Sequence, residues 1–135
     1  MVQPVAPMLQ PYNPLLDFSG LPRFAQIGPE HVAPAVDRLL AEGRELIAAL
    51  ATAPATWDAF VAPLEDANER IGRAWGLVSH LHAVLDSPAL REAYNAALPK
   101  LTEYWTELGQ NRELYEKYKA LAASPEFPSL SRARR

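Results

Sequence analysis

Hydrophobic positions between residues 29 and 50 recur at intervals of three and four, the period of a helix with one apolar face. The stripe consists of Val32, Val36, Leu39, Leu40, Leu46, Ile47 and Leu50. Pro29 suits the first turn of a helix, where its missing N–H leaves no hydrogen bond unmade. The letters "ATAPAT" follow at residues 51–56, so we expect this helix to end near residue 50.

A second helical stripe runs over residues 63–85. Thr56 is a good N-cap, but Pro63 comes too late in a helix that begins there to be accommodated without a break or kink. The pattern therefore predicts a short helix and then a long one, with an inward stripe of Leu64, Ala67, Ile71, Ala74, Trp75, Val78, Leu81 and Leu85. On the outer face, the spacing predicts the ion pairs Asp66–Arg70 and Glu69–Arg73, each worth roughly a few tenths of a kcal/mol.

Two further helices follow. Ser87 and Pro88 form an N-cap followed by a proline at the first helical position, which predicts a helix to about residue 108 with a kink at Pro99. Its expected inward residues are Leu90, Tyr94, Leu98, Leu101, Trp105 and Leu108. Gly109 ends it, and Asn111 caps a last helix over residues 112–122 that carries Leu114, Tyr115, Tyr118 and Leu121.

The two ends of the chain differ from this pattern. Five prolines in residues 1–22 predict an extended arm (Pro4, Pro7, Pro11, Pro14 and Pro22), whose Leu15, Leu16 and Phe18 should lie on a neighbouring surface. At the other end, "FPSLSRARR" places an N-cap, Ser131, before helix-forming residues and then stops. We therefore expect the helical domain, residues 23–135, to be cut short at its C-terminal end.

The fold class follows from these elements. No segment shows the alternation of a strand, and short loops between long amphipathic helices favour antiparallel packing. The sequence predicts an all-α fold: an antiparallel bundle of four to five helices, with a proline-rich arm at residues 1–22.

Composition narrows the function. The chain has 135 residues, 49% of them hydrophobic and 21% charged, which is typical of one globular domain. The net charge of -3 is spread along the chain, and the one basic cluster is Arg132, Arg134 and Arg135, so we expect no nucleic-acid partner. The absence of cysteine excludes disulfides and thiolate chemistry. No apolar run reaches the roughly 20 residues of a membrane span, and the first residues lack a signal-peptide pattern, so we expect a cytoplasmic protein.

The segment "SHLHAVLDSP" at residues 79–88 is the candidate metal site. Residues two apart on a helix are rotated by about 200°, so His80 and His82 cannot chelate one metal from the same helix. His82 and Asp86 are four apart and can meet, but two ligands at a helix end make a weak site. We therefore interpret both histidines as structural or surface residues, and expect a hydrogen-bonding role for His31 in a first helical turn.

Other candidate chemistry also has a structural interpretation. Glu65, Asp66 and Glu69 form an acidic patch, but acid–base work requires a cleft that shifts their pKa values, and two arginines lie beside them. The aromatic residues lie mostly on apolar stripes, where packing explains them. No phosphate-binding glycine loop and no serine-nucleophile motif are present. We predict no catalytic or metal residue in this chain.

The order of several segments carries a resemblance to a known family. These are "NPLL" at residues 13–16, "PRFAQIGPEHVAPAV" at 22–36, "TWDAFVAPLE" at 56–65 and the stretch from "VSHL" to "YKAL" at 78–121. Together they resemble the N-terminal region of the oligopeptidase A branch of the M3 zinc metallopeptidases, the thimet-oligopeptidase-like family. The resemblance covers nearly the whole chain from residue 13 onward.

The resemblance implies a function for a larger protein. Members of this family are helical shells around a deep channel, in which zinc held by an H-E-x-x-H helix and a later glutamate cleaves short peptides. That motif lies far beyond residue 135 in such proteins, so no ligand is carried over to this chain. The implied role is a non-catalytic N-terminal domain that walls the channel, with the C-terminal catalytic part of the same polypeptide and short peptides as partners. A domain separated from that part should expose apolar side chains and self-associate.

Two alternatives remain. A free-standing helical adaptor would bind a partner helix in a groove. Reading the gene beyond residue 135 distinguishes it from the peptidase, because an H-E-x-x-H helix several hundred residues on indicates the peptidase. A small histidine-based metalloprotein is the other alternative, and the ligand geometry argues against it.

Overall fold

The computed structural model describes residues 11–135, and Pro4 and Pro7 of the expected arm lie outside this range. Four α-helices account for most of it: α1 (Val32–Leu50), α2 (Ala62–Val84), α3 (Pro88–Gly109) and α4 (Arg112–Ala122). A π-helical turn, Trp57–Val61, leads into α2, and five 3₁₀ turns make up much of the rest: Pro14–Leu16, Phe24–Gln26, Pro29–His31, Phe127–Ser129 and Arg132–Arg134. No strand occurs in residues 11–135, so the predicted all-α fold is confirmed.

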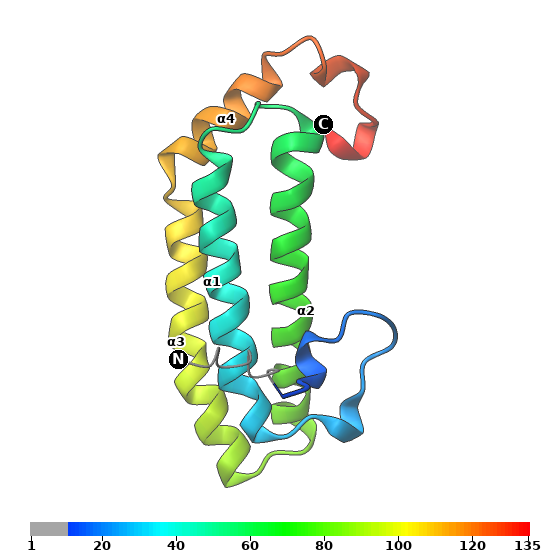
Figure 1. Ribbon diagram of the computed structural model, residues 1–135, viewed down its shortest axis with the longest axis vertical. Coiled ribbons are helices and arrows are strands. Elements are labelled where there is room, and N and C mark those ends of the chain that lie inside the picture. The colour runs from blue at the N-terminus through cyan, green and yellow to red at the C-terminus, as the bar shows by residue number, and fades with distance from the viewer. Residues whose placement is uncertain (1–10) are drawn as a thin grey trace, which may run out of the picture.

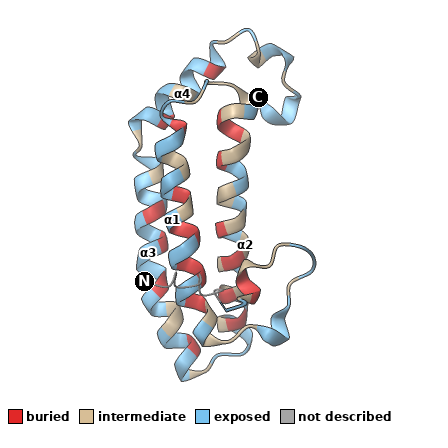
Figure 2. Cartoon of the chain, in the orientation of Figure 1, coloured by how far each residue is buried: buried red, intermediate tan, exposed pale blue. Residues whose placement is uncertain are grey.

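The three long helices pack side by side, and α4 crosses one end of them (Figure 1). Helix α1 contacts both α2 and α3. Helices α1 and α2 run antiparallel, as do α2 and α3, whereas α1 and α3 run parallel because α2 returns the chain to its starting end. Buried residues lie where the three helices face each other (Figure 2).

A close contact between α1 and α3 fixes the middle of the core. Tyr104 of α3 is only 1% exposed, and its ring lies against Gly43 of α1. A Cβ placed on Gly43 would come within 2.6 Å of the Tyr104 hydroxyl oxygen. That hydroxyl donates to Oδ1 of Asn68 on α2 at 3.3 Å, and burial raises the pKa of Tyr104. One side chain therefore joins three helices.

Helix α4 is held by a second apolar cluster at the end of the bundle. Its buried members come from the end of α1, the π-helical turn, α2 and α4: Leu50, Phe60, Val61, Leu64, Leu114 and Leu121. The ring of Tyr118 also packs edge-on against Phe60, with centroids 4.8 Å apart. Since α4 presents two buried leucines rather than a long stripe, it closes the end of the bundle instead of running beside the other helices.

Three of the four predicted N-caps are confirmed, and the fourth, Ser131, is not. The side chains of Thr56, Ser87 and Asn111 each accept a hydrogen bond from the backbone N–H three residues later, at 3.0–3.2 Å. Pro63 produces no gap, because the π-helical turn continues directly into α2 and places this proline in its first turn. Helix α3 continues through Pro99 without interruption, so no break occurs there.

Several side chains expected to face inward are exposed. On α3, Leu98 and Trp105 are each 39% exposed, and Ala97 and Tyr104 occupy the buried row in their place. Leu85 falls just after the end of α2 and is also exposed, as are Tyr115 and Tyr118 on α4. The orientation of α3 about its own axis fits the contact with Gly43. With Ala97 and Tyr104 facing inward, the Tyr104 ring packs against this glycine, where a larger residue would leave no room.

The described part of the arm is docked on the bundle as expected. Leu15 is 1% exposed within the main core, and Leu16 and Phe18 pack against it. Phe18 lies under the guanidinium groups of Arg70 and Arg73, at 4.9 and 5.9 Å from its ring centroid.

The predicted i,i+4 ion pairs on α2 are wrong. Arg70 lies 3.8 Å from Glu42 of α1, and Arg73 donates to the carbonyl of Gly20 in the arm. Contacts with α1 and with the arm therefore replace the predicted pairs within α2, because the guanidinium groups of both arginines lie over the ring of Phe18.

The last residues fold back over the start of α2. Glu126 accepts the backbone N–H of Trp57 at 3.3 Å, and the guanidinium of Arg134 lies 4.7 Å from the Trp57 ring. Ser131 makes no side-chain cap, so the helix start expected there is a short 3₁₀ turn.

Candidate functional site

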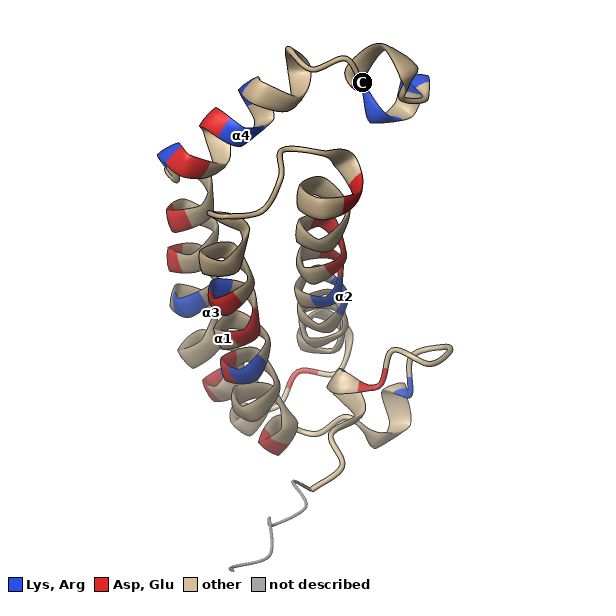
Figure 3. Ribbon diagram, turned by 45° about the horizontal axis from the view of Figure 1, so that its top comes forward, with Lys and Arg blue, Asp and Glu red and all other residues tan. Residues whose placement is uncertain are grey.

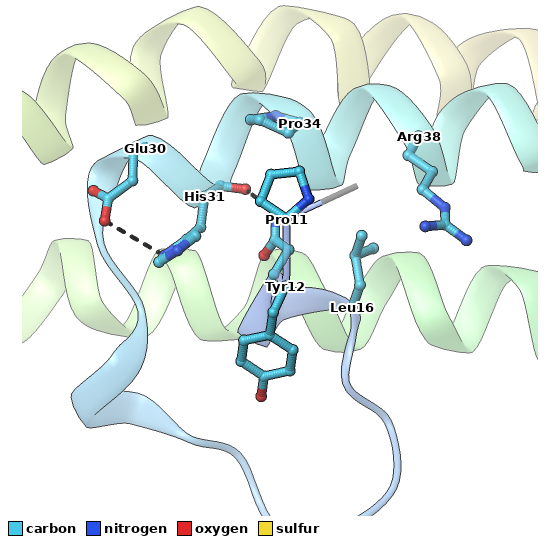
Figure 4. Close-up of a pocket in the computed structure, with 8 residues that line it drawn as sticks. Pro11, Tyr12, Leu16, Glu30, His31, Pro34 and Arg38 are labelled. Atoms are coloured by element: carbon cyan, nitrogen blue, oxygen red, sulfur yellow. Dashed lines mark hydrogen bonds and ion pairs between the residues drawn. The ribbon is translucent and has the colours of Figure 1, made fainter. Parts of the chain in front are cut away.

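A pocket lies between the arm and the start of α1 (Figure 4). It has a volume of about 810 Å³, within the range of small-molecule sites. Its lining is mainly apolar with a few polar groups: Pro11, Tyr12, Asn13, Leu16, Glu30, His31, Pro34 and Arg38. The local sequence explains its position, because Pro14 and Pro29 begin the two 3₁₀ turns whose ends meet here.

Asn13 holds the two walls of this pocket together. Its side-chain oxygen accepts the N–H of Leu15 at 3.0 Å, and its amide donates to the carbonyl of His31 at 2.9 Å. Nδ1 of His31 in turn accepts the N–H of Gly28 at 2.9 Å, so a neutral ring carries its proton on Nε2. The expected hydrogen-bonding role of His31 is therefore confirmed.

Two of the polar side chains that line this pocket, Arg38 and Tyr12, already have acidic partners. Arg38 donates to Glu42 at 2.7 Å, and Tyr12 donates to Asp17 at 3.0 Å. Asp17 also accepts from Ser19 and Arg23, and these hydrogen bonds, with Ser19 contributing most, lower the pKa of its carboxyl group strongly. This combination of apolar surface and a few polar groups is suited to binding a small ligand.

The histidines of α2 point to different neighbours, as the helical spacing predicted. His80 packs against Phe24 of the arm, with ring centroids 5.5 Å apart. His82 stacks on Tyr94 of α3 at 4.1 Å, and its Nδ1 lies 3.2 Å from Asp86. The structure therefore does not bring His80 and His82 together.

The residues present do not fit a zinc ion. The nearest candidate is the pair of His82 and Asp86, and Nε of Arg91 donates to Asp86 at 3.0 Å. That hydrogen bond is the main cause that lowers the pKa of the Asp86 carboxyl group. Within residues 11–135, no three histidine, aspartate or glutamate side chains are grouped as metal ligands would be. No reaction step is therefore assigned to zinc in this chain.

The acidic patch of Glu65, Asp66 and Glu69 is a solvent-exposed face of α2. Figure 3 shows acidic and basic residues interspersed along the helices. No helix in residues 11–135 is long and apolar enough to cross a membrane.

Sequence reasoning missed the residues that build the pocket beside His31. Tyr12 and Arg38 carried no motif, and Asn13 was noted only as part of "NPLL". The pocket depends on a contact between residues 18 apart, Asn13 and His31. The one local signal was the asparagine before Pro14, which is a common cap for a short turn.

Comparison with known proteins gives the chain its family. Residues 36–135 match the family model described as neurolysin/thimet oligopeptidase, N-terminal domain. The chain is 48% identical over 124 residues to oligopeptidase A of Haemophilus influenzae and 42% identical over 125 residues to oligopeptidase A of Escherichia coli. It is 36% identical over 123 residues to the probable cytosolic oligopeptidase A of Arabidopsis thaliana.

These alignments cover 91%, 91% and 90% of the chain, respectively. They cover only 18% of the length of each relative, so the chain spans less than a fifth of those proteins. The matched region includes all four α-helices except the first four residues of α1. The chain belongs to the family of neurolysin/thimet oligopeptidase N-terminal domains.

Proposed function

We propose that this chain is the N-terminal, non-catalytic helical part of a zinc-dependent oligopeptidase that hydrolyses short peptides. In that enzyme it forms part of the wall of the substrate channel, and the C-terminal part of the same polypeptide carries the zinc and the catalytic groups. The observation that carries the proposal is the family match over residues 36–135, together with relatives named oligopeptidase A of which this chain spans 18%.

The structure supports a wall rather than a reaction centre. The three long helices share one core whose buried residues are 0–6% exposed, and Tyr104 joins all three. Such packing gives a rigid surface, which a channel of fixed width requires. Three charged side chains at or beside the two candidate sites already have partners: Asp86 is paired with Arg91, Asp17 with Arg23 and Arg38 with Glu42.

We place this enzyme in the cytoplasm. The name of the Arabidopsis thaliana relative includes the word cytosolic, and a chain without cysteine suits a reducing compartment.

The test uses the polypeptide encoded by the complete reading frame. We expect it to cleave an internally quenched short peptide, to lose this activity after treatment with a chelator and to regain it with zinc. His80→Ala and His82→Ala should leave cleavage unchanged, because neither side chain is proposed as a ligand. Cleavage that survives removal of zinc, or that is lost in either histidine variant although the protein remains folded, contradicts the proposal.

A further inference from the structure

One exposed flank of α3 carries uncharged residues over about three helical turns, from residue 95 to residue 106. Asn95, Leu98, Thr102 and Trp105 form one row at intervals of three and four, and Pro99 and Thr106 lie beside it. All six are exposed. We call these six residues the outer stripe.

The two threonines make the outer stripe more apolar than their type suggests. Thr102 donates its hydroxyl hydrogen to the carbonyl of Leu98 at 3.0 Å, and Thr106 donates to the carbonyl of Thr102 at 2.8 Å. Since both hydroxyl groups bind the helix backbone, their methyl groups are left for a neighbour. A shallow groove of about 710 Å³ follows Leu98, Pro99 and the two threonines.

Such a stripe is unusual for a solvated helix face. Charged residues make up 21% of the chain, and the exposed face of α4 alternates acidic and basic residues. The inner face of α3 is already used by the core through Leu101 and Tyr104. A helix with apolar residues on two separate faces is typical of a helix that is covered on both sides.

We propose that the outer stripe of α3 is the docking site for a helix from the C-terminal remainder of the same polypeptide. This inference rests on the proposed function, and it adds the surface through which the two parts join. The relatives indicate where this helix comes from, because more than four fifths of their length lies outside the region that this chain matches.

The edge of the stripe indicates the chemistry of that helix. Glu103 and Glu107 line one side of the groove; Arg44 is paired with Glu107 at 2.9 Å and also lies within reach of the charge of Glu103, so two carboxylates share one cation. Pro99 has no N–H to give to the carbonyl of Asn95, which leaves an acceptor on the stripe. The occupant should therefore have an apolar face flanked by a lysine or arginine. A second copy of this chain, packed through the same stripe, would bring another acidic edge and supply no further cation.

The test is photo-cross-linking in the polypeptide encoded by the complete reading frame. p-Benzoylphenylalanine replaces Thr102 in one variant and Glu116, on the exposed face of α4, in a control variant. We expect a cross-link within one polypeptide from position 102 to a helical segment beyond residue 135, identified by mass spectrometry, and no such cross-link from position 116.

Four other outcomes overturn the inference. They are a cross-link from position 102 to a second copy, a cross-link to a different protein, the same yield at both positions, or no cross-link at all. Peptide cleavage by the unmodified polypeptide is measured in parallel. If the cross-link forms but cleavage is absent, the proposed function fails and the interface stands. If cleavage occurs but the cross-link is absent, the interface fails alone. A reading frame that ends at residue 135 would contradict both.

Discussion

Replacing Gly43 by alanine tests the contact at the centre of the bundle. Gly43 lies in the middle of α1, where alanine is intrinsically the better residue by about 0.5–1 kcal/mol. An added Cβ, however, would lie 2.6 Å from the hydroxyl oxygen of Tyr104 and 3.0 Å from two of its ring carbons. Helix propensity therefore predicts that Gly43→Ala raises the free energy of unfolding, whereas packing predicts that it lowers this free energy.

Packing should prevail at this position. The Tyr104 ring is 1% exposed and lies among three helices, so it cannot swing into solvent. Overpacking a core of this kind costs about 1–3 kcal/mol, and losing the hydrogen bond to Asn68 adds about 1 kcal/mol. After the gain in helix propensity, Gly43→Ala should lower the free energy of unfolding by about 1–3 kcal/mol.

Urea denaturation followed by circular dichroism at 222 nm measures this change. Gly76 gives the matched control: it lies within α2, is exposed, and has no atom within 4 Å of the place that an added Cβ would take. Gly76→Ala should therefore stabilise the chain by about 0.5–1 kcal/mol. In a double variant, Tyr104→Phe removes the nearest oxygen, and the two changes together should cost less than their sum. A Gly43→Ala variant as stable as Gly76→Ala would show that the Tyr104 ring is not closely packed on α1.

Four further predictions concern the arm, the histidines and the exposed surface. Phe18→Ala should destabilise the docked arm by about 1–2 kcal/mol and speed trypsin cleavage after Arg23; an unchanged cleavage rate would show that Phe18 does not anchor the arm. The pKa of Asp17 is lowered, so its contribution to stability is present above its ordinary value of 3.8 and is lost as the pH falls below it. The urea midpoint of Asp17→Asn should therefore depend less on pH between about 5 and 3 than that of the unchanged chain. Calorimetry should detect no one-to-one zinc binding at micromolar affinity; such binding, abolished by His80→Ala, would overturn the interpretation of the histidines. Light scattering should show self-association of the 135-residue chain at high concentration, reduced by Trp105→Glu, whereas a strict monomer would argue against an uncovered apolar surface.

Local signals predicted the helices well. Thr56, Ser87 and Asn111 each cap the helix that the sequence assigned to them, because a cap depends on a side chain and a backbone group only three residues apart. The opposite directions of His80 and His82 also followed from the sequence, since helix geometry alone sets the angle between residues two apart.

Contacts between distant segments could not be predicted in the same way. The period of α3 allows more than one inward row, and the larger side chains of Leu98 and Trp105 favoured the wrong one. The buried row is selected by Gly43, which is about 60 residues away from Tyr104 along the chain. Arg70 likewise lies beside Glu42 of α1 rather than beside Asp66 of α2. Its guanidinium group also lies over Phe18 of the docked arm, which no short-range pattern could predict.

The candidate site was predicted only in part. The sequence indicated that the histidine segment is not a chelating pair, and the geometry agrees. The pocket beside His31 was missed, since it is formed by Asn13 joining two proline-led turns that no short-range pattern connects.

The decisive experiment for the proposed function compares cleavage of one internally quenched short peptide by the purified 135-residue chain and by the polypeptide from the complete reading frame. Both samples are supplied with zinc at the same concentration. We expect zinc-dependent cleavage by the complete polypeptide and none by the 135-residue chain, because the described residues offer no group that holds zinc or activates water. Zinc-dependent cleavage by the 135-residue chain, or none by the complete polypeptide, would contradict the proposed function.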